Sequence, residues 1–160
     1  MIVETYQAAK SASLALRRAC PTDAGAITIL NRVLAIDADG VNLDDQTLRA
    51  GVLAVLHNPA LGRYWLACGP EKAVIGQLEL KTLFDEWTNQ YYGWIDNVAV
   101  ARPFRQQGIA ARLVERAKQH ARHRGLTMLR LYVAGDNDAA ERLYVREGFK
   151  PKGRLLEYRL

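Results

Sequence analysis

Three strand-like segments in a row, followed at once by a long amphipathic helix, limit the fold of this chain more than any other feature. Residues 63–68, 73–83 and 91–100 are rich in the β-branched and aromatic residues that strands favour, and Gly69-Pro70-Glu71-Lys72 forms a turn between the first two. Such short connections favour antiparallel pairing, so we expect a β-meander. A helix over residues 108–124 is indicated by one apolar stripe: Ile109, Leu113, Ala117 and Ala121.

Further helices and strands are expected on both sides of this unit. Before it, the pattern predicts a strand over 13–20 and two helices, from Thr22 to about Ile36 and from Asp44 or Asp45 to about Leu56. After it, we expect a strand, a shorter helix and a final strand or hairpin, over 128–133, 138–147 and 149–158. The order β-α-α-β-β-β-α-β-α-β predicts an α/β (α+β) fold with a mixed, mostly antiparallel central sheet flanked by helices. The length of 160 residues predicts one domain over 1–160, in which 1–12 is a loose N-terminal segment.

The composition is that of a globular protein, with 49% hydrophobic and 24% charged residues. No apolar run approaches the roughly 20 residues that cross a bilayer, so we expect no membrane partner. Cys20 and Cys68 are too few for a disulfide framework and lack the paired spacing of a metal site. We therefore expect no metal and a cytoplasmic location.

The charges are distributed unevenly along the chain. Residues 1–100 carry 8 basic and 11 acidic side chains, whereas residues 101–160 carry 14 basic and 6 acidic ones. A formal net charge of +5 by itself suggests a nucleic-acid partner, and this distribution suggests that the second part of the chain holds a polyanionic ligand, which the charges alone do not identify.

The stretch from Val98 to Ala110 carries the clearest chemical signal. A predicted strand ends, Pro103 breaks it, and a short basic turn opens directly into the long helix. The first N–H groups of a helix have no partner within it, and the helix dipole adds positive potential there. Gly108 lets a ligand approach the backbone with no side chain between them. We therefore expect a pyrophosphate at this turn.

Two motifs resemble those of a known superfamily. Arg105-Gln106-Gln107-Gly108-Ile109-Ala110 is similar to the acetyl-CoA-binding signature of the GNAT N-acetyltransferases, Arg/Gln-x-x-Gly-x-Gly/Ala, and it follows a strand ending in Val-x-Val. Residues 137–149 contain every element of the second signature, Asn-x-x-Ala-x-x-Leu-Tyr-x-x-x-Gly-Phe. The resemblance covers about residues 14–160. It implies an acetyl-CoA-dependent N-acetyltransferase that moves an acetyl group directly to a primary amine of a small molecule or peptide.

The resemblance also implies which residues contact acetyl-CoA. In the superfamily the strand bulges and splays at the position of Val98, Ala99 and Val100, where main-chain groups bind the pantetheine arm and one N–H polarises the thioester carbonyl. Asn137 would contact the cofactor, although the sequence Asp136-Asn137-Asp138 is also typical of a helix cap. The cofactor-binding residues are expected to be Val98, Ala99, Val100, Arg105, Gln106, Gln107, Gly108, Ile109, Ala110, Asn137 and Tyr144.

Three residues are candidates for catalysis. The resemblance gives Tyr144 the role of general acid toward the CoA sulfur, and the alternative is simple packing of an amphipathic aromatic. A carboxylate must take a proton from the acceptor ammonium before its nitrogen can attack. Asp96 is the first candidate, because period-two alternation places it on one face with Trp94, Val98 and Val100. Glu79 on the neighbouring strand is the second, and the alternative for each is a solvated or salt-bridged carboxylate.

The acceptor amine is expected to meet acidic and aromatic residues of the first part of the chain. Five candidates lie in and beside the loop between two predicted strands: Asp85, Glu86, Trp87, Tyr91 and Tyr92. Their carboxylates and rings could attract an amine by charge and cation–π contact. The alternative is a surface hairpin whose aromatic side chains pack on each other.

Two other functions stay open at this point. One is a GNAT-fold acyltransferase that uses another acyl-CoA or another acceptor. The other is a basic nucleic-acid-binding protein without catalysis, which the scarcity of aromatic residues among the basic ones disfavours, so we expect no nucleic-acid partner. A homodimer is compatible with the sequence.

Overall fold

The computed structural model describes residues 14–158 and residue 160. Five strands and four α-helices alternate along the described chain, with single turns of 3-10 helix between some of them. In chain order they are β1 (Ala15–Arg18), η2 (Pro21–Asp23), α2 (Ala24–Asp39), α3 (Asp45–His57), β2 (Arg63–Cys68), η3 (Pro70–Lys72), β3 (Val74–Asp85), β4 (Gln90–Val100), η4 (Arg102–Phe104), α4 (Ile109–His123), β5 (Leu129–Leu131) and α5 (Asp138–Arg146).

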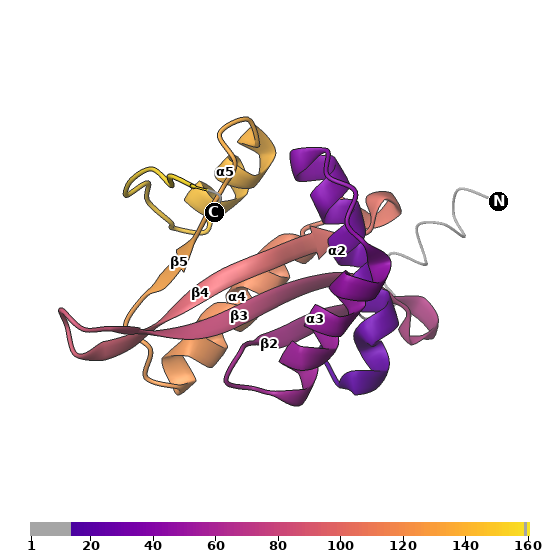
Figure 1. The fold of residues 1–160 in the computed structure, drawn as a ribbon, viewed down its shortest axis with the longest axis horizontal. Helices are drawn as coiled ribbons and strands as arrows, with labels where there is room; N and C mark the ends of the chain where they lie inside the picture. The colour runs from indigo at the N-terminus through magenta and orange to yellow at the C-terminus, as the bar shows by residue number, and fades with distance from the viewer. Residues whose placement is uncertain (1–13, 159) are drawn as a thin grey trace.

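The strands form a single sheet in the order β1-β2-β3-β4-β5 (Figure 1). Neighbouring strands from β1 to β4 are antiparallel, and β5 joins β4 in parallel. The parallel pair follows from the connection, because a chain that crosses the sheet through α4 returns in the direction of the strand it left. The predicted mixed, mostly antiparallel sheet is thus confirmed.

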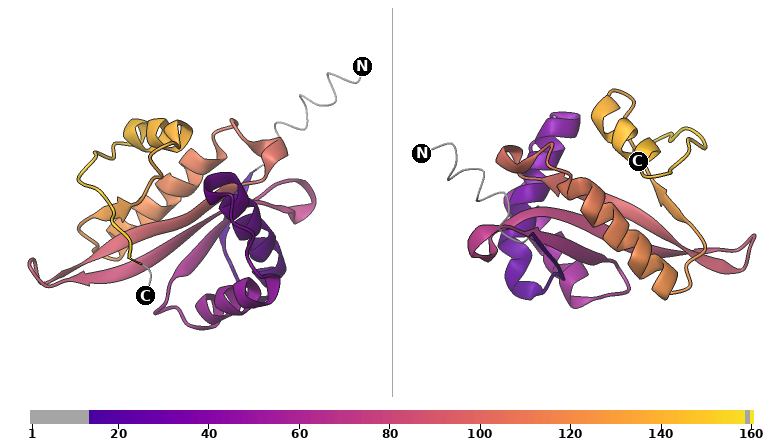
Figure 2. Two further views of the ribbon diagram at one scale, coloured as in Figure 1. Left: turned by 45° about the horizontal axis from the view of Figure 1, so that its top comes forward. Right: turned by 180° about the vertical axis from the view of Figure 1, so that it is seen from behind.

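Helices cover both faces of the sheet. Helices α2 and α3 lie on the face toward the viewer in Figure 1, and α4 crosses the opposite face, as the right-hand view of Figure 2 shows. Because strand side chains alternate in direction, β2 is buried on both sides: Trp65 and Ala67 pack in the cluster of α4, and Tyr64 and Leu66 pack in the cluster of α2 and α3. Leu113 of α4 has no exposed surface and lies in the larger cluster.

A β-bulge interrupts the pairing of β3 with β4. Glu79 pairs with Asp96, but Gln77 pairs with Ala99, so β4 has an extra residue in this stretch. Asn97 takes up this residue with a positive φ of 48°. The alternation therefore resets: Asp96 lies on the face of α2, whereas Val98 and Val100 pack into the core cluster of α4. The prediction that Asp96 shares a face with Val98 and Val100 is wrong for this reason.

Two other predicted details differ from the structure. The final strand or hairpin expected over 149–158 is absent, and these residues have no regular secondary structure. Pro151 removes a backbone donor and Gly153 weakens a strand, so apolar residues alone do not establish pairing there. Strand β5 is also shorter than predicted, and the start of the first predicted strand, Ser13, lies outside the described residues. Among the described residues, no helix is both long and apolar enough to span a membrane.

Candidate active site

The two strands β4 and β5 part at the bulge. Their parallel pairing runs only from Gly93 to Ile95 of β4. Past Ile95, no strand among the described residues pairs with the edge of β4 that faces β5. Those main-chain groups of Val98–Val100 that point to this edge therefore have no strand partner there, as the resemblance implies for a bound pantetheine, although the carbonyl of Val100 accepts from Arg105.

The turn that follows β4 leads directly into the start of α4. Gln106 and Gly108 have positive φ values of 61° and 78°, which turn the chain into the helix. No side chain caps this helix start, and a Cβ at Gly108 would meet nothing within 4 Å. The first N–H groups of α4 are therefore free to bind an anion.

Two arginines of this turn bind the same carboxylate of α2. Asp37 accepts hydrogen bonds from Arg102 at 2.5 Å and from Arg105 at 2.6 Å, and these bonds lower the pKa of Asp37 to about 2. Arg105 also donates through Nε to the carbonyl of Val100 at 2.9 Å. Arg105 was predicted as a cofactor ligand; in the structure, its side chain braces the turn against α2 and β4.

Helix α5 presents Tyr144 to the sheet. The side chain of Asn137 caps this helix by accepting from the N–H of Ala140 at 3.1 Å, which is the alternative that the sequence offered for it. The Tyr144 ring is buried and packs edge-on against Phe149, with ring centres 5.7 Å apart. Burial, together with the charge of Asp96, raises the pKa of Tyr144 to about 12. The hydroxyl is therefore protonated at neutral pH, as a general acid requires.

The two predicted carboxylates are direct neighbours across β3 and β4, and Lys81 joins them. The Lys81 ammonium lies 2.8 Å from Oδ2 of Asp96 and 3.8 Å from Oε2 of Glu79. Glu79 is 2% exposed as a residue, whereas the side chain of Asp96 is 42% exposed. Asp96 is thus the accessible carboxylate of the pair, and Glu79 lies behind it.

A buried polar network holds Glu79. Asn97, on the bulge, donates to its Oε2 at 2.8 Å and to the hydroxyl of Tyr64 at 3.2 Å. Asn31 of α2 donates to the same hydroxyl at 3.2 Å, and it accepts from Gln77. Burial raises the pKa of Glu79, while Lys81 and Asn97 act in the opposite direction. The effect of burial is the larger one, so the pKa of Glu79 lies above the usual range of a glutamate.

Several members of this network were missed in the sequence. The missed residues are Asn31, Tyr64, Gln77, Lys81 and Asn97. A signal was present for two of them, because Gln77, Glu79 and Lys81 alternate along one strand and so share one face. The contributions of Asn31 and Tyr64 depend on packing between distant segments, and that of Asn97 depends on the bulge.

The structure does not bring the predicted acceptor-binding residues together with the carboxylates. Asp85, Glu86, Trp87 and Tyr91 lie at the far end of the β3–β4 hairpin, and Trp87 is 93% exposed. Six residues of extended β4 separate Gln90 from Asp96, roughly 20 Å. Phe84 and Tyr91 pack edge-on, with ring centres 5.3 Å apart, as in the alternative of a surface hairpin.

Tyr92 is the exception among these five. It lies on the same sheet face as Asp96, and the guanidinium of Arg130 stacks on its ring at 4.4 Å. Of the predicted acceptor site, Tyr92 therefore shares the sheet face of the two carboxylates and lies four residues before Asp96 on β4.

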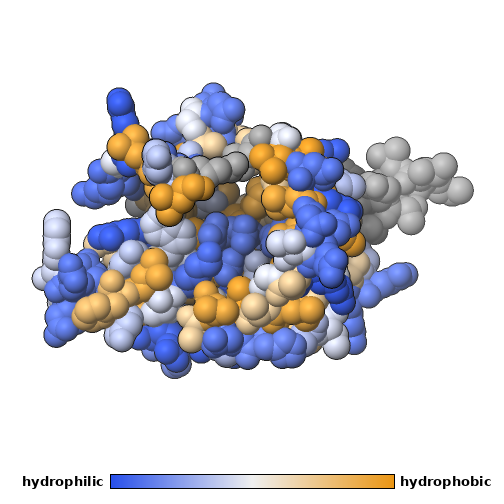
Figure 3. Space-filling view, in the orientation of Figure 1, coloured by the Kyte–Doolittle hydropathy of each residue, from blue (hydrophilic) through white to orange (hydrophobic). Residues whose placement is uncertain are grey.

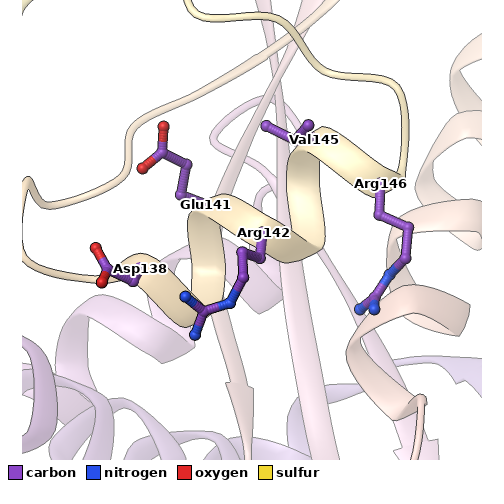
Figure 4. Close-up of a pocket in the computed structure, with 5 residues that line it drawn as sticks. All are labelled: Asp138, Glu141, Arg142, Val145 and Arg146. Carbon is purple, nitrogen blue, oxygen red and sulfur yellow. The ribbon is translucent and has the colours of Figure 1, made fainter.

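Two surface features are separate from this site. Figure 4 shows a hollow lined only by residues of one helix, α5: Asp138, Glu141, Arg142, Val145 and Arg146. None of them was predicted as a site residue. A second hollow lies between the β3–β4 hairpin and the loop after α4, where Thr82 and Thr127 are among its lining residues. Within the described part of the chain, no group of His, Cys, Asp and Glu side chains could hold a metal ion.

The chain matches a known protein family over most of its length. The sequence model of the acetyltransferase (GNAT) family matches residues 35–149. The chain therefore belongs to the GNAT acetyltransferase family.

Two relatives are similar over parts of the sequence. An aminoalkylphosphonate N-acetyltransferase of Salmonella typhimurium is 32% identical over 108 residues, which cover 68% of this chain and 69% of that protein. GCN5-related N-acetyltransferase 6, chloroplastic, of Arabidopsis thaliana is 39% identical over 59 residues, or 37% of this chain. The match spans only 20% of that plant protein's length.

Solved structures share the whole fold. A possible acetyltransferase from Clostridium difficile 630 has a TM-score of 0.83 and 26% identity, over 92% of this chain and 97% of that one. A predicted acetyltransferase from Clostridium acetobutylicum, crystallised with acetyl-CoA, has a TM-score of 0.77 and 21% identity, over 92% and 96% of the two chains. The predicted fold class is thus confirmed.

Proposed function

We propose that this protein is an acetyl-CoA-dependent N-acetyltransferase that transfers the acetyl group directly to a primary amine. One observation carries the proposal: the free edge of β4, the uncapped start of α4 and the buried Tyr144 lie around the point where β4 and β5 part. The structure of the Clostridium acetobutylicum acetyltransferase with acetyl-CoA supports this choice of donor.

Two features of the described residues support acetyl-CoA as the donor. The N–H groups at the start of α4 would bind its pyrophosphate, and no Cβ obstructs them at Gly108. Main-chain groups of Val98–Val100 would pair with the pantetheine amides. The donor supplies an acetyl thioester, whose carbonyl a main-chain N–H at the bulge would polarise.

Proton movements are assigned to the carboxylates and to Tyr144. The carboxylate pair takes one proton from the acceptor ammonium, which leaves a lone pair on the nitrogen. The N–C bond then forms as the C–S bond breaks, and Tyr144 donates its proton to the leaving sulfur. The second proton lost by the nitrogen restores the Tyr144 hydroxyl. The protein needs no covalent intermediate, and neither Cys20 nor Cys68 takes part.

The acceptor class is narrowed by the relative from Salmonella typhimurium. Its name describes an amine acceptor that also carries a phosphonate. We propose a small amine as the acceptor of this chain too, and Asp96 as the residue that meets its ammonium, because Asp96 is the accessible carboxylate.

A thiol-release assay tests the proposal. Acetyl-CoA is offered with polyamines, amino acids, aminoglycosides and peptide N-termini, and release of CoA must require both protein and amine. Acetylated product detected by mass spectrometry would support the assignment. The absence of amine-dependent release across the panel would overturn it. Salt-dependent DNA binding without thermal stabilisation by acetyl-CoA would instead favour the nucleic-acid alternative.

A further inference from the structure

The face of the sheet beside Asp96 carries two cations in a row with an aromatic ring between them. Lys81 of β3 pairs with Trp94 of β4, and Trp94 pairs with Arg130 of β5. Residues paired directly across strands point to the same face, so all three lie on the face of Asp96. In Figure 1, helices α2 and α3 leave this half of β3 and β4 uncovered. Figure 3 shows the same face hollowed near its centre, with hydrophilic side chains around part of the hollow.

Both cations keep unused hydrogen-bond donors. The Lys81 ammonium has three N–H donors; within the described residues it donates to Asp96, and its contact with Glu79 is too long for a hydrogen bond. Arg130 donates through Nε to the sulfur of Met128 at 3.3 Å, and its contact with Asp85 is also long, at 3.8 Å. Its side chain is 45% exposed. Each cation therefore has donors available for an anionic ligand.

The side chain of Arg130 is restrained although its Nη1 and Nη2 atoms have no hydrogen-bond partner among the described residues. Its guanidinium stacks on the ring of Tyr92, which limits the side-chain entropy that binding a ligand would cost. The Cα atoms of Arg130 and Asp96 are roughly 8 Å apart, as one strand spacing and two residues of rise require. Asp96 and Lys81 are themselves in contact, so the site offers a negative and a positive group side by side, and a second positive group further along.

We propose that the acceptor is an amine that also carries an acidic group, a carboxylate or phosphonate, and that Lys81 and Arg130 select it. The amine binds Asp96, and the acidic group binds Lys81 when the linker is short and Arg130 when it is longer. This arrangement disfavours polyamines, because their second cation would meet a cation of the protein. The inference rests on the proposed function and narrows its acceptor.

Matched acceptors test this selectivity. β-Alanine is compared with propylamine, and 6-aminohexanoate with hexylamine, with spermidine as a third class. The readout is the ratio of kcat/KM for the acid-bearing amine to that for its partner without the acid. We expect a ratio of at least about tenfold for one pair, since a charged hydrogen bond in a partly buried site contributes that much.

Variants assign the effect to each cation. Arg130→Gln should bring the ratio of the longer pair close to one, and Lys81→Gln should do the same for the shorter pair. Lys72→Gln, which removes an exposed cation from the turn between β2 and β3, is the control and should leave both ratios unchanged. The inference would be overturned if propylamine and hexylamine both had a kcat/KM equal to or higher than that of their acid-bearing partners, or if spermidine had a higher kcat/KM than both acids. Either result would leave the proposed function intact. If no amine is acetylated, the proposed function fails and this inference fails with it.

Discussion

Gly62 lies against the buried carboxylate of Glu79, so a methyl group added at Gly62 tests whether Glu79 occupies this position in the folded protein. A Cβ built at Gly62 would lie 2.5 Å from Oε1 of Glu79 and 3.3 Å from Cγ of Lys81. Glu79 is almost fully buried, and its other carboxylate oxygen accepts a hydrogen bond from Asn97, so moving the carboxylate away would disturb this bond. Overpacking of this kind costs about 1–3 kcal/mol, so Gly62→Ala should lower the urea midpoint by about 0.5–1.5 M for a slope of about 2 kcal/mol/M.

A double-mutant cycle separates the contact from any change in backbone strain. Gly62→Ala is made in the wild-type chain and in Glu79→Ala, where the colliding carboxylate is gone and the backbone contribution is the same. The two costs should differ by about 1–2 kcal/mol, within the range for residues in contact. Gly51→Ala, within α3, is the control: a Cβ there meets nothing within 4 Å, and it should stabilise by about 0.5–1 kcal/mol. An equal cost of Gly62→Ala in both backgrounds would show that the contact with Glu79 does not cause the loss of stability.

Three further predictions concern the cap of α5, an ion pair and the base. Asn137→Ala should lower the free energy of unfolding by about 0.5–2 kcal/mol, measured by urea titration, whereas Asn137→Asp should retain most of it. Asp23 accepts a hydrogen bond from Arg17, and this bond lowers the pKa of Asp23 from 3.8 to about 2. The ionised carboxylate therefore contributes about 2 kcal/mol to the free energy of unfolding above pH 3.8, and this contribution is lost as the pH falls toward 2. The stability of Asp23→Asn should depend less on pH in that window. If Glu79 is the base, kcat/KM should rise with pH through a pKa above the usual range of a glutamate, and Glu79→Gln should remove this limb while Asp96→Asn retains it.

The fold could largely be predicted from the sequence, because the apolar residues of its long helices and strands recur with a strong periodicity. The stripe of Ile109, Leu113 and Ala117 predicted α4, and all three are buried in one core cluster. The segment over 149–158 misled the prediction, since its apolar residues suggested a strand that the structure lacks. Strand pairing needs a partner edge as well as composition, and local sequence does not report that edge.

The candidate site was predictable only in part, for a physical reason that centres on one residue. Motif spacing indicated the turn before α4, Tyr144 and the two carboxylates. The bulge at Asn97 could be expected from the resemblance, but its effect on side-chain direction was not included in the alternation, so Asp96 was assigned to the wrong face. Lys81 was overlooked because a lysine on a strand usually faces solvent, whereas here it bridges Asp96 and Glu79.

The proposed transfer of a proton to the CoA sulfur depends on the hydroxyl of Tyr144. Tyr144→Phe removes only the hydroxyl and keeps the packing against Phe149. Turnover with saturating acetyl-CoA and amine is measured beside the Kd for acetyl-CoA. We expect kcat to fall by about 10²-fold or more, the size of a general-acid contribution, while Kd changes little. An unchanged kcat would rule out this role for Tyr144.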